Sequence, residues 1–378
     1  MRIGIPSTFP PFRGGIAAFN QNMAEAFSKA GHDVVCVNWT RQYPKILFPG
    51  TSQYAPNAAP SVCPAVVDSI NPWTWAKAVE VLQADGPLDV AVLPFWHAFL
   101  SASSAGIAGQ IRRNHPATRI IGLMHNAGSH DGPVMMEHLT RRFVSKLDEV
   151  WTLSSDVSAR VASMSTAKEL EIKTLFHPLY DHFPPAPNRE ASLAQLGLPA
   201  DAEVYLFFGL IRPYKGLMRL LEVWDAFAHV HPSAHLLIAG ECYGDWGQYE
   251  RAIESLRFRD RVHAANAFVP DAQVGIHFGA ANAVILPYER ASQSGVTAMA
   301  LHYGVPTVAS DVGGLSEYIT SGQTGELFTP RSSPSLLEAL SRVAAHDPGT
   351  SVGAFAQARR DFSWAQFAER GLAHAKRH

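Results

Sequence analysis

The chain has 378 residues, a formal net charge of −2, 17% charged residues and 47% hydrophobic ones. A single core usually stops growing at about 250 to 300 residues, so this length predicts two domains. The near-neutral charge argues against a nucleic-acid-binding surface, and the hydrophobic fraction argues against a disordered chain.

Three cysteines, Cys36, Cys63 and Cys242, are odd in number, lie far apart in the sequence and form no CxxC pair. This spacing argues against a disulfide framework and a zinc site, and it favours a reducing cytoplasm. The opening MRIGIPSTFPPFRGG has neither the basic start nor the long apolar run of an export signal. The most apolar long window, residues 89–109, is typical of a buried strand and the following helix rather than a membrane span.

In the first half, short runs rich in β-branched residues alternate with helical periods. The expected strands are residues 2–6, 32–39, 88–96, 119–126 and 149–154, and a helix is expected over 17–30. Alternation of this kind is typical of a parallel α/β sheet.

A Pro-rich stretch over 183–203 interrupts the alternation and predicts an interdomain linker. The pattern then restarts, with a helix expected over 216–229 and strands expected at 204–209, 235–241, 261–268, 282–288 and 305–311. We therefore expect an α/β protein with two Rossmann-like domains, 1–182 and 204–345, facing each other across a crevice. Helices over 346–378 are expected to cross back to the first domain.

A loop with two glycines, Gly14 and Gly15, lies between the first strand and the first helix. Such a loop lets the backbone approach a phosphate at the helix N-terminus, although a plain strand-to-helix turn also explains it. No GxGxxG pattern is present, which argues against a nicotinamide-dependent oxidoreductase.

Two cations, Arg212 and Lys215, follow the first strand of the second domain. Fixed cations there suit a departing diphosphate, whereas a solvated basic turn is the ordinary alternative. Further along, Ser294 and Gly295 open a helix and can offer N–H groups and a hydroxyl to phosphate. The later pair Gly313–Gly314 is more simply a tight turn.

Two histidines, His125 and His130, flank the loop after the strand 119–124. A polar side chain at a strand's carboxyl end can hydrogen-bond a sugar hydroxyl, which favours His125. A histidine that satisfies loop backbone groups is the alternative, and it applies more strongly to His130.

Taken together, these loops resemble family-4 retaining glycosyltransferases of GT-B fold over nearly the whole chain. The resemblance rests on the Gly14–Gly15 loop, HNxxxH at 125–130, FHPLYDHF at 176–183, FFGLIRPYKG at 207–216 and GVPTVASDVGGLSE at 304–317. YPKILFPG at 43–50 and INPWTW at 70–75 resemble a bacterial subset, many members of which build surface polysaccharides.

The resemblance implies that Arg212 and Lys215 hold the diphosphate of a nucleotide-sugar donor, that Gly15 approaches it from the opposite domain, and that His125 contacts the donor sugar. It implies a metal-independent reaction with no cofactor, on a UDP- or GDP-linked sugar. That agrees with the lack of a clustered Asp or His ligand set in the sequence.

One departure from the family concerns two glutamates eight positions apart, which many members carry before a Gly-x-Pro. Counting back from the Gly-x-Pro places Ala291 and Met299 there, while Glu289 would have Thr297 as its partner. Neither register restores two carboxylates.

The related subset carries QSGV at this place. We therefore expect Gln293, Ser294, Gly295 and Val296 to line the donor through backbone and short polar groups. Glu241, after the strand 235–240, is a candidate carboxylate for a sugar hydroxyl, with a plain charged loop residue as the alternative.

The acceptor is expected against the first domain, because aromatic faces suit sugars and basic residues suit phosphates. The candidate residues are Phe12, Arg13, Trp73, Trp75, Trp96, Arg141 and Arg142. A glycan or lipid-linked acceptor fits, with peripheral membrane contact as an option. Interleaved acids in EHLTRRFVSKLDEV make an ordinary solvated helix the better interpretation of that segment.

No residue stands out as a covalent nucleophile, so the expected reaction is front-face attack by the acceptor hydroxyl with retention. Two other classes stay open. The chain could be a non-catalytic nucleotide-sugar-binding homologue that supports a partner enzyme, or a hydrolase or epimerase of the same fold.

Overall fold

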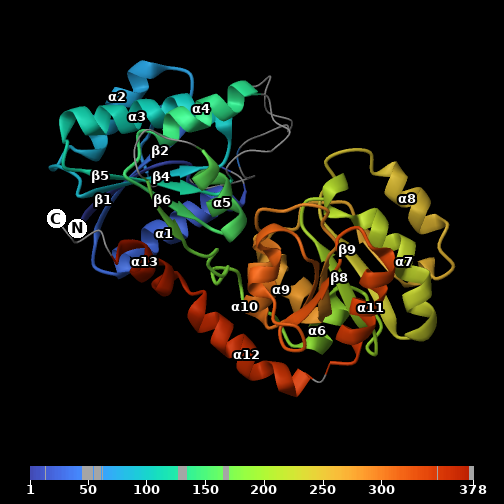
Figure 1. Cartoon of the computed structure of the whole chain (residues 1–378). Helices are drawn as coiled ribbons and strands as arrows, with labels where there is room; N and C mark the ends of the chain where they lie inside the picture. The colour runs from blue at the N-terminus through green and yellow to red at the C-terminus, as the bar shows by residue number, and fades with distance from the viewer. Residues whose placement is uncertain are drawn as a thin grey trace. The chain divides into compact units, whose positions relative to one another are not determined.

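The computed structural model describes residues 1–12, 14–44, 54, 61, 63–126, 134–164, 170–346 and 348–373. The chain divides into two compact units (Figure 1). Unit 1 comprises Met1–Phe176 together with Trp364–His378, and unit 2 comprises His177–Ser363. Each unit is a parallel sheet between two layers of helices, so the predicted fold class, two Rossmann-like α/β domains, is confirmed.

Unit 1 contains a seven-stranded parallel sheet of order β3-β2-β1-β4-β5-β6-β7. Its strands are β1 (Arg2–Pro6), β2 (Asp33–Arg41), β3 (Ala65–Asp68), β4 (Val90–Phe95), β5 (Arg119–Met124), β6 (Glu149–Thr152) and β7 (Glu171–Thr174). Every residue of β4 is buried, because helices cover both faces of a parallel sheet.

The helices of unit 1 form two layers (Figure 1). They are α1 (Gly15–Lys29), α2 (Pro72–Leu82), α3 (Ser101–Asn114), α4 (Val134–Val144), α5 (Ser155–Ser163) and α13 (Trp364–Leu372), with a 3₁₀ turn η2 (Ala98–Leu100). Helices α2, α3 and α4 pack side by side over one face, while α13 packs against α1 on the other.

Helix α13 contributes directly to the core of unit 1. Phe367 is fully buried, and its ring meets those of Phe19, Trp151 and Phe176 at centroid distances of 5.8, 6.1 and 6.0 Å. A Cβ on Gly371 would lie 2.9 Å from the Trp151 ring, so only glycine permits this close approach.

Unit 2 contains a six-stranded parallel sheet of order β10-β9-β8-β11-β12-β13. Its strands are β8 (Glu203–Phe208), β9 (Ala234–Ala239), β10 (Val262–Ala265), β11 (Ala281–Leu286), β12 (Thr307–Ser310) and β13 (Gly325–Phe328). The chain winds outward from β8 in one direction and from β11 in the other, so the strand order reverses between β8 and β11.

Helices cover both faces of this second sheet (Figure 1). They are α6 (Arg189–Gln195), α7 (Leu217–Val230), α8 (Gly247–Glu254), α9 (Asp271–Ala280), α10 (Gly295–Tyr303) and α11 (Ser333–Ala344), while α12 (Pro348–Asp361) packs against α10. The 3₁₀ turns are η3 (Pro213–Lys215), η4 (Arg259–Arg261) and η5 (Gly313–Tyr318). One core lies under α7 and α11, and a second lies under α6, α9 and α10.

The Pro-rich stretch predicted as a linker, residues 183–203, carries helix α6 and packs within unit 2. Asn188 caps this helix by accepting from the Ala191 N–H, and Leu193 is 2% exposed in the core beneath it. The chain passes between the units at Phe176–His177 and at Ser363–Trp364.

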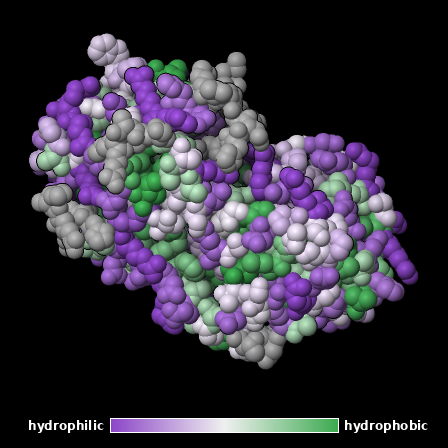
Figure 2. Space-filling view, viewed as in Figure 1, coloured by the Kyte–Doolittle hydropathy of each residue, from purple (hydrophilic) through white to green (hydrophobic). Residues whose placement is uncertain are grey.

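The apolar window at 89–109 forms β4, η2 and the start of α3, as its sequence indicates. In the part of the chain that the structure describes, no helix has the length and apolarity needed to cross a membrane. Hydrophilic residues are interspersed with hydrophobic ones on the face shown in Figure 2.

The three cysteines are free thiols. Cys36 and Cys63 are distant in the sequence but neighbours in the fold, because β2 pairs with β3 in a register that joins Asn38 to Ala65. The Cys36 thiol is hydrogen-bonded to Cys63, and this contact, more than burial, raises the pKa of Cys36.

Candidate functional site

The predicted cation pair lies at the carboxyl edge of the unit 2 sheet, where β8 and β11 mark the reversal of strand order. Ligands of open α/β sheets bind at such reversal points. The turn η3 follows β8 and carries Arg212 and Lys215, while α10 follows the neighbouring β11. The two predicted phosphate-binding segments therefore flank the same position.

Two glycines shape the turn that holds Lys215. Gly209 has φ +94°, and a Cβ placed there would lie 4.0 Å from Lys215 Nζ. Gly216 has φ +71°, and a Cβ there would lie 1.9 Å from the Pro287 carbonyl oxygen. The turn can reach the β11 loop only because position 216 has no side chain.

Lys215 is held by an aromatic neighbour. Its ammonium donates to the Tyr288 hydroxyl at 3.0 Å and lies 4.7 Å from the centre of the Tyr288 ring. Burial alone lowers the pKa of Lys215, but the Tyr288 and Tyr214 hydroxyls outweigh it, so the pKa lies above its ordinary value. Lys215 is therefore a fixed cation at neutral pH.

Arg212 extends beside a second tyrosine, with its guanidinium carbon 5.3 Å from the Tyr243 ring centre. The residue before Arg212 is joined to the segment that follows β9, because the Ile211 N–H donates to the Glu241 carbonyl at 2.9 Å. Glu241 is half-buried just beyond the end of β9, on the same carboxyl edge as Arg212.

The N-terminus of α10 presents the QSGV segment. Ser294 caps the helix by accepting from the Val296 N–H at 3.3 Å. A Cβ on Gly295 would lie 2.8 Å from the Tyr180 ring, so this position admits no side chain without movement of a buried ring. Gln293 Oε1 is buried, and among the described residues it has no hydrogen-bond partner.

Residues in the region of the missing glutamate pair make other contacts. The Glu289 carboxylate lies 3.8 Å from both Arg219 and Arg331, and Thr297 is 1% exposed inside α10. Gly313, with φ +51°, packs tightly against the Ala291 carbonyl oxygen, which fits the tight turn expected there. Glu289 is thus engaged by two arginines.

In unit 1 the strand order reverses between β1 and β4, and the glycine loop lies at this reversal. Gly14 is the N-cap of α1 with φ +104°, and both Gly14 and Gly15 are exposed. His125 directly follows β5, and its buried ring packs edge-on against Phe19 at 4.7 Å. His130 lies outside the described residues.

The residues proposed for the acceptor occupy varied environments. Trp73 is 86% exposed at the start of α2, whereas the indoles of Trp75 and Trp96 donate to the Asp68 carbonyl and the Tyr43 hydroxyl. Phe12 is buried, Arg141 pairs with Glu137, Arg142 is exposed and Arg13 lies outside the described residues.

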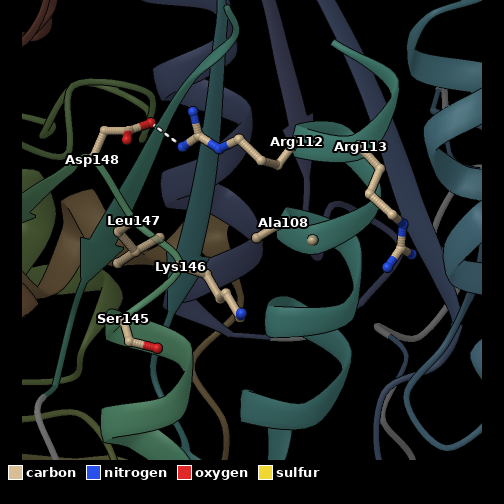
Figure 3. Close-up of a pocket in the computed structure, with 8 residues that line it drawn as sticks. Ala108, Arg112, Arg113, Ser145, Lys146, Leu147 and Asp148 are labelled. Carbon is tan, nitrogen blue, oxygen red and sulfur yellow. Dashed lines mark hydrogen bonds and ion pairs between the residues drawn. The ribbon is translucent and has the colours of Figure 1, made fainter. Parts of the chain in front are cut away.

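A cavity of about 570 Å³ lies elsewhere in unit 1, between α3 and the end of α4 (Figure 3). Arg112 from α3 pairs there with Asp148, and Arg113 and Lys146 are also at its rim. Because Asp148 immediately precedes β6, the cavity lies at the amino edge of the sheet, opposite to the edge that carries Gly14 and His125. We assign it no part in the site.

Within unit 2 the structure brings together Arg212, Lys215 and the α10 N-terminus. Sequence reasoning missed Tyr288, which holds Lys215, and Tyr180, whose ring lies against Gly295. Tyr180 lies in FHPLYDHF and Tyr288 ends the strand expected over 282–288, but a tyrosine in an apolar run gives no sign that its hydroxyl meets a lysine. In the described ranges, no cluster of three His, Cys, Asp or Glu side chains is placed to hold a metal ion.

Comparison with known proteins identifies the class of the fold. Residues 188–358 match the model of the family described as Glycosyl transferases group 1. HepE of Anabaena, solved in complex with UDP and glucose, superposes with a TM-score of 0.74 at 16% identity, covering 99% of this chain and 100% of that one. The chain therefore has the GT-B fold, and most of its second unit matches the glycosyltransferase group 1 family.

Two curated glycosyltransferases are also similar to this chain in sequence. The chain is 33% identical over 208 residues to the D-inositol 3-phosphate glycosyltransferase of Kineococcus radiotolerans, covering 50% of this chain and 48% of that protein. It is 27% identical to the lipopolysaccharide 1,2-N-acetylglucosaminetransferase of Salmonella typhimurium, covering 47% and 49%. The chain thus spans about half the length of these relatives.

Proposed function

We propose that the chain is a retaining, metal-independent glycosyltransferase that moves a sugar from a UDP- or GDP-linked donor to a glycan or lipid-linked acceptor in polysaccharide biosynthesis. The observation that carries the proposal is the fixed Lys215 ammonium beside Arg212 and the α10 N-terminus at the strand reversal of unit 2. The named relatives and the nucleotide in HepE support the donor class.

In this mechanism, the bond between the anomeric carbon and the diphosphate oxygen breaks while the acceptor oxygen bonds to that carbon from the same face. The acceptor proton passes to the departing phosphate oxygen. Arg212, Lys215 and the N–H groups that open α10 stabilise the charge that develops on the diphosphate. His125 and the segment Gln293–Val296 contact the donor, and the first unit receives the acceptor.

The test measures nucleotide release from a panel of UDP-, GDP- and ADP-sugars, with and without oligosaccharide and lipid-linked acceptors. Acceptor-dependent release from one donor is expected, and Lys215→Ala should lower its rate by about 10²-fold. The matched control is Lys146→Ala, at the amino edge of unit 1, which should leave the rate unchanged. NMR of the product should show the anomeric configuration of the donor, and a chelator should leave the rate unchanged.

Other outcomes point to the other classes. Donor binding without release would indicate a non-catalytic homologue, and release that needs no acceptor would indicate a hydrolase or epimerase. Inversion at the anomeric carbon would contradict retention.

A further inference from the structure

Tyr288 is a buried residue on the loop between β11 and α10, and its position in the sequence alone predicts no role for it. It follows β11 by two positions and is 2% exposed. Its hydroxyl accepts from Lys215 Nζ at 3.0 Å and lies 3.4 Å from Ser294 Oγ. Its backbone carbonyl accepts from the Ser310 hydroxyl, which anchors the residue to the end of β12.

These contacts constrain Lys215. The hydroxyl fixes the ammonium by a charge-assisted hydrogen bond, and the ammonium lies at the hydroxyl end of the ring, 4.7 Å from the ring centre. A lysine has a flexible four-carbon stem, and holding it in one geometry normally costs side-chain entropy when a ligand binds. Because Tyr288 already holds the ammonium in the folded protein, less side-chain entropy is lost when a ligand binds.

The same hydroxyl connects two segments that are distant in the sequence. Ser294, which caps α10, lies on one side of it, and Lys215, at the end of η3, lies on the other. The ammonium and the open end of the helix are therefore positioned relative to one another through a single side chain.

We propose that Tyr288 is a positioning residue that holds the Lys215 ammonium in register with the N-terminus of α10 for a nucleoside diphosphate. This inference rests on the proposed function of the same site. Tyr288 acts through Lys215 and Ser294 rather than as a catalytic residue.

The charged and titratable groups around Lys215 come from two elements. Arg212 and Tyr214 lie on its own turn, and Tyr288 comes from the β11 loop. The nearby Glu289 is directed to Arg219 and Arg331. Loss of the Tyr288 hydroxyl removes the largest of the contributions that oppose the effect of burial on the pKa of Lys215.

The test measures the binding of UDP and GDP by calorimetry to Tyr288→Phe, Lys215→Met and the double variant. Tyr288→Phe keeps the ring and removes only the hydroxyl, and it should weaken binding of the preferred nucleotide by about tenfold. In the Lys215→Met background the same change should cause a clearly smaller loss, since the hydroxyl then has no ammonium to hold and only its contact with Ser294 is removed. Tyr205→Phe, at a 1% exposed tyrosine of β8, is the matched control and should bind like the unsubstituted protein.

A pH series gives a readout that a purely structural role would not change. Affinity should fall at alkaline pH as Lys215 loses its proton, and Tyr288→Phe should move that fall to lower pH. In the unsubstituted protein, the ε-methylene protons of Lys215, assigned by their loss in Lys215→Met, should show a nuclear Overhauser contact with tyrosine ring protons, since the ammonium lies 4.7 Å from the Tyr288 ring centre. This last measurement does not depend on the folding of any Tyr288 variant.

The inference is overturned if Tyr288→Phe binds like Tyr205→Phe while Lys215→Met binds weakly, if the losses add fully in the double variant, or if the ε-methylene protons show no contact with a tyrosine ring. Those results leave the proposed function standing. Absence of binding to UDP, GDP and inorganic pyrophosphate by the unsubstituted protein overturns the proposed function itself and the inference with it.

Discussion

Glycine at position 216 decides whether η3 can approach the β11 loop. Gly216 and Gly197 have nearly the same backbone conformation, with φ of +71° and +67°, but a Cβ at 197 would meet no atom within 4 Å. Gly197→Ala should therefore cost only the strain of a left-handed alanine, about 1 kcal/mol of unfolding free energy. Gly216→Ala adds a clash with the Pro287 carbonyl and should cost about 3 kcal/mol or more.

Urea unfolding of both variants checks this difference. Equal losses of stability would show that the carbonyl contact moves aside at little cost and that the turn is not constrained by position 216.

His177 couples the stability of unit 2 to pH. Its Nδ1 donates to the Pro178 carbonyl at 2.8 Å, and burial lowers the pKa of the ring to about 4. Because the folded pKa lies below the ordinary value of 6.5, the unfolded chain takes up the proton first as pH falls. The contribution to stability is therefore complete above pH 6.5 and declines towards pH 4, by about 3 kcal/mol in total.

Chemical unfolding of the wild type and of His177→Gln between pH 7 and pH 4 tests this coupling. The variant should be less stable at pH 7 but should show a shallower decline. A change at the exposed His229 should leave the decline as it is in the wild type, and an unchanged slope in His177→Gln would rule out the coupling.

The placement of some of these residues could be predicted and that of others could not. Arg212, Lys215 and Ser294 follow expected strands, which places them at the carboxyl edge of the sheet, and their binding of phosphate stays a prediction. The Tyr288 and Tyr180 contacts depend on side chains that meet across loops distant in the sequence, and no spacing rule encodes such a meeting. Glu289 is a similar case, because its position in the sequence does not indicate that its partners are Arg219 and Arg331.

At the scale of elements, the buried central strands were the predictable part. Strands β4, β5, β8 and β11 lie inside the sheets and are continuous apolar runs, which the sequence pattern indicates directly. Strands β3, β7 and β13 were missed, and each has only four residues at a sheet edge. An edge strand such as β7, EIKT, is partly exposed along its length and so lacks that pattern.

Ser294 caps α10, and its proposed second role in nucleotide binding can be separated from capping by comparison with a second helix. Ser294 and Ser332 both accept an N–H of their own helix at 3.3 Å, and loss of either cap should cost about 1 kcal/mol of stability. Only Ser294 lies beside Tyr288 and the proposed diphosphate position. Ser294→Ala should therefore weaken UDP or GDP binding as well, whereas Ser332→Ala should not.

Thermal unfolding together with nucleotide titration measures both effects. Equal nucleotide affinity in the two variants would remove Ser294 from the proposed donor contacts.

At the scale of the whole molecule, unit 1 is completed by a helix that follows unit 2 in the sequence. Truncation of Phe367 removes the ring that joins Phe19, Trp151 and Phe176, and Phe367→Ala should cost unit 1 about 3–5 kcal/mol. Hydrogen–deuterium exchange should quicken in the strands of unit 1 and stay slow in those of unit 2. Equal acceleration in both sheets would mean that the units unfold together.

The position of α13 also sets an order of events on the ribosome. Every residue of unit 2 is synthesised before Trp364–Leu372, so its fold can close while unit 1 still lacks a helix. Until translation passes that helix, the aromatic face around Phe19 and Trp151 has no cover, and the nascent first half offers a hydrophobic surface that a chaperone can bind. Unit 1, most of which is synthesised first, is thus the unit that completes its folding last.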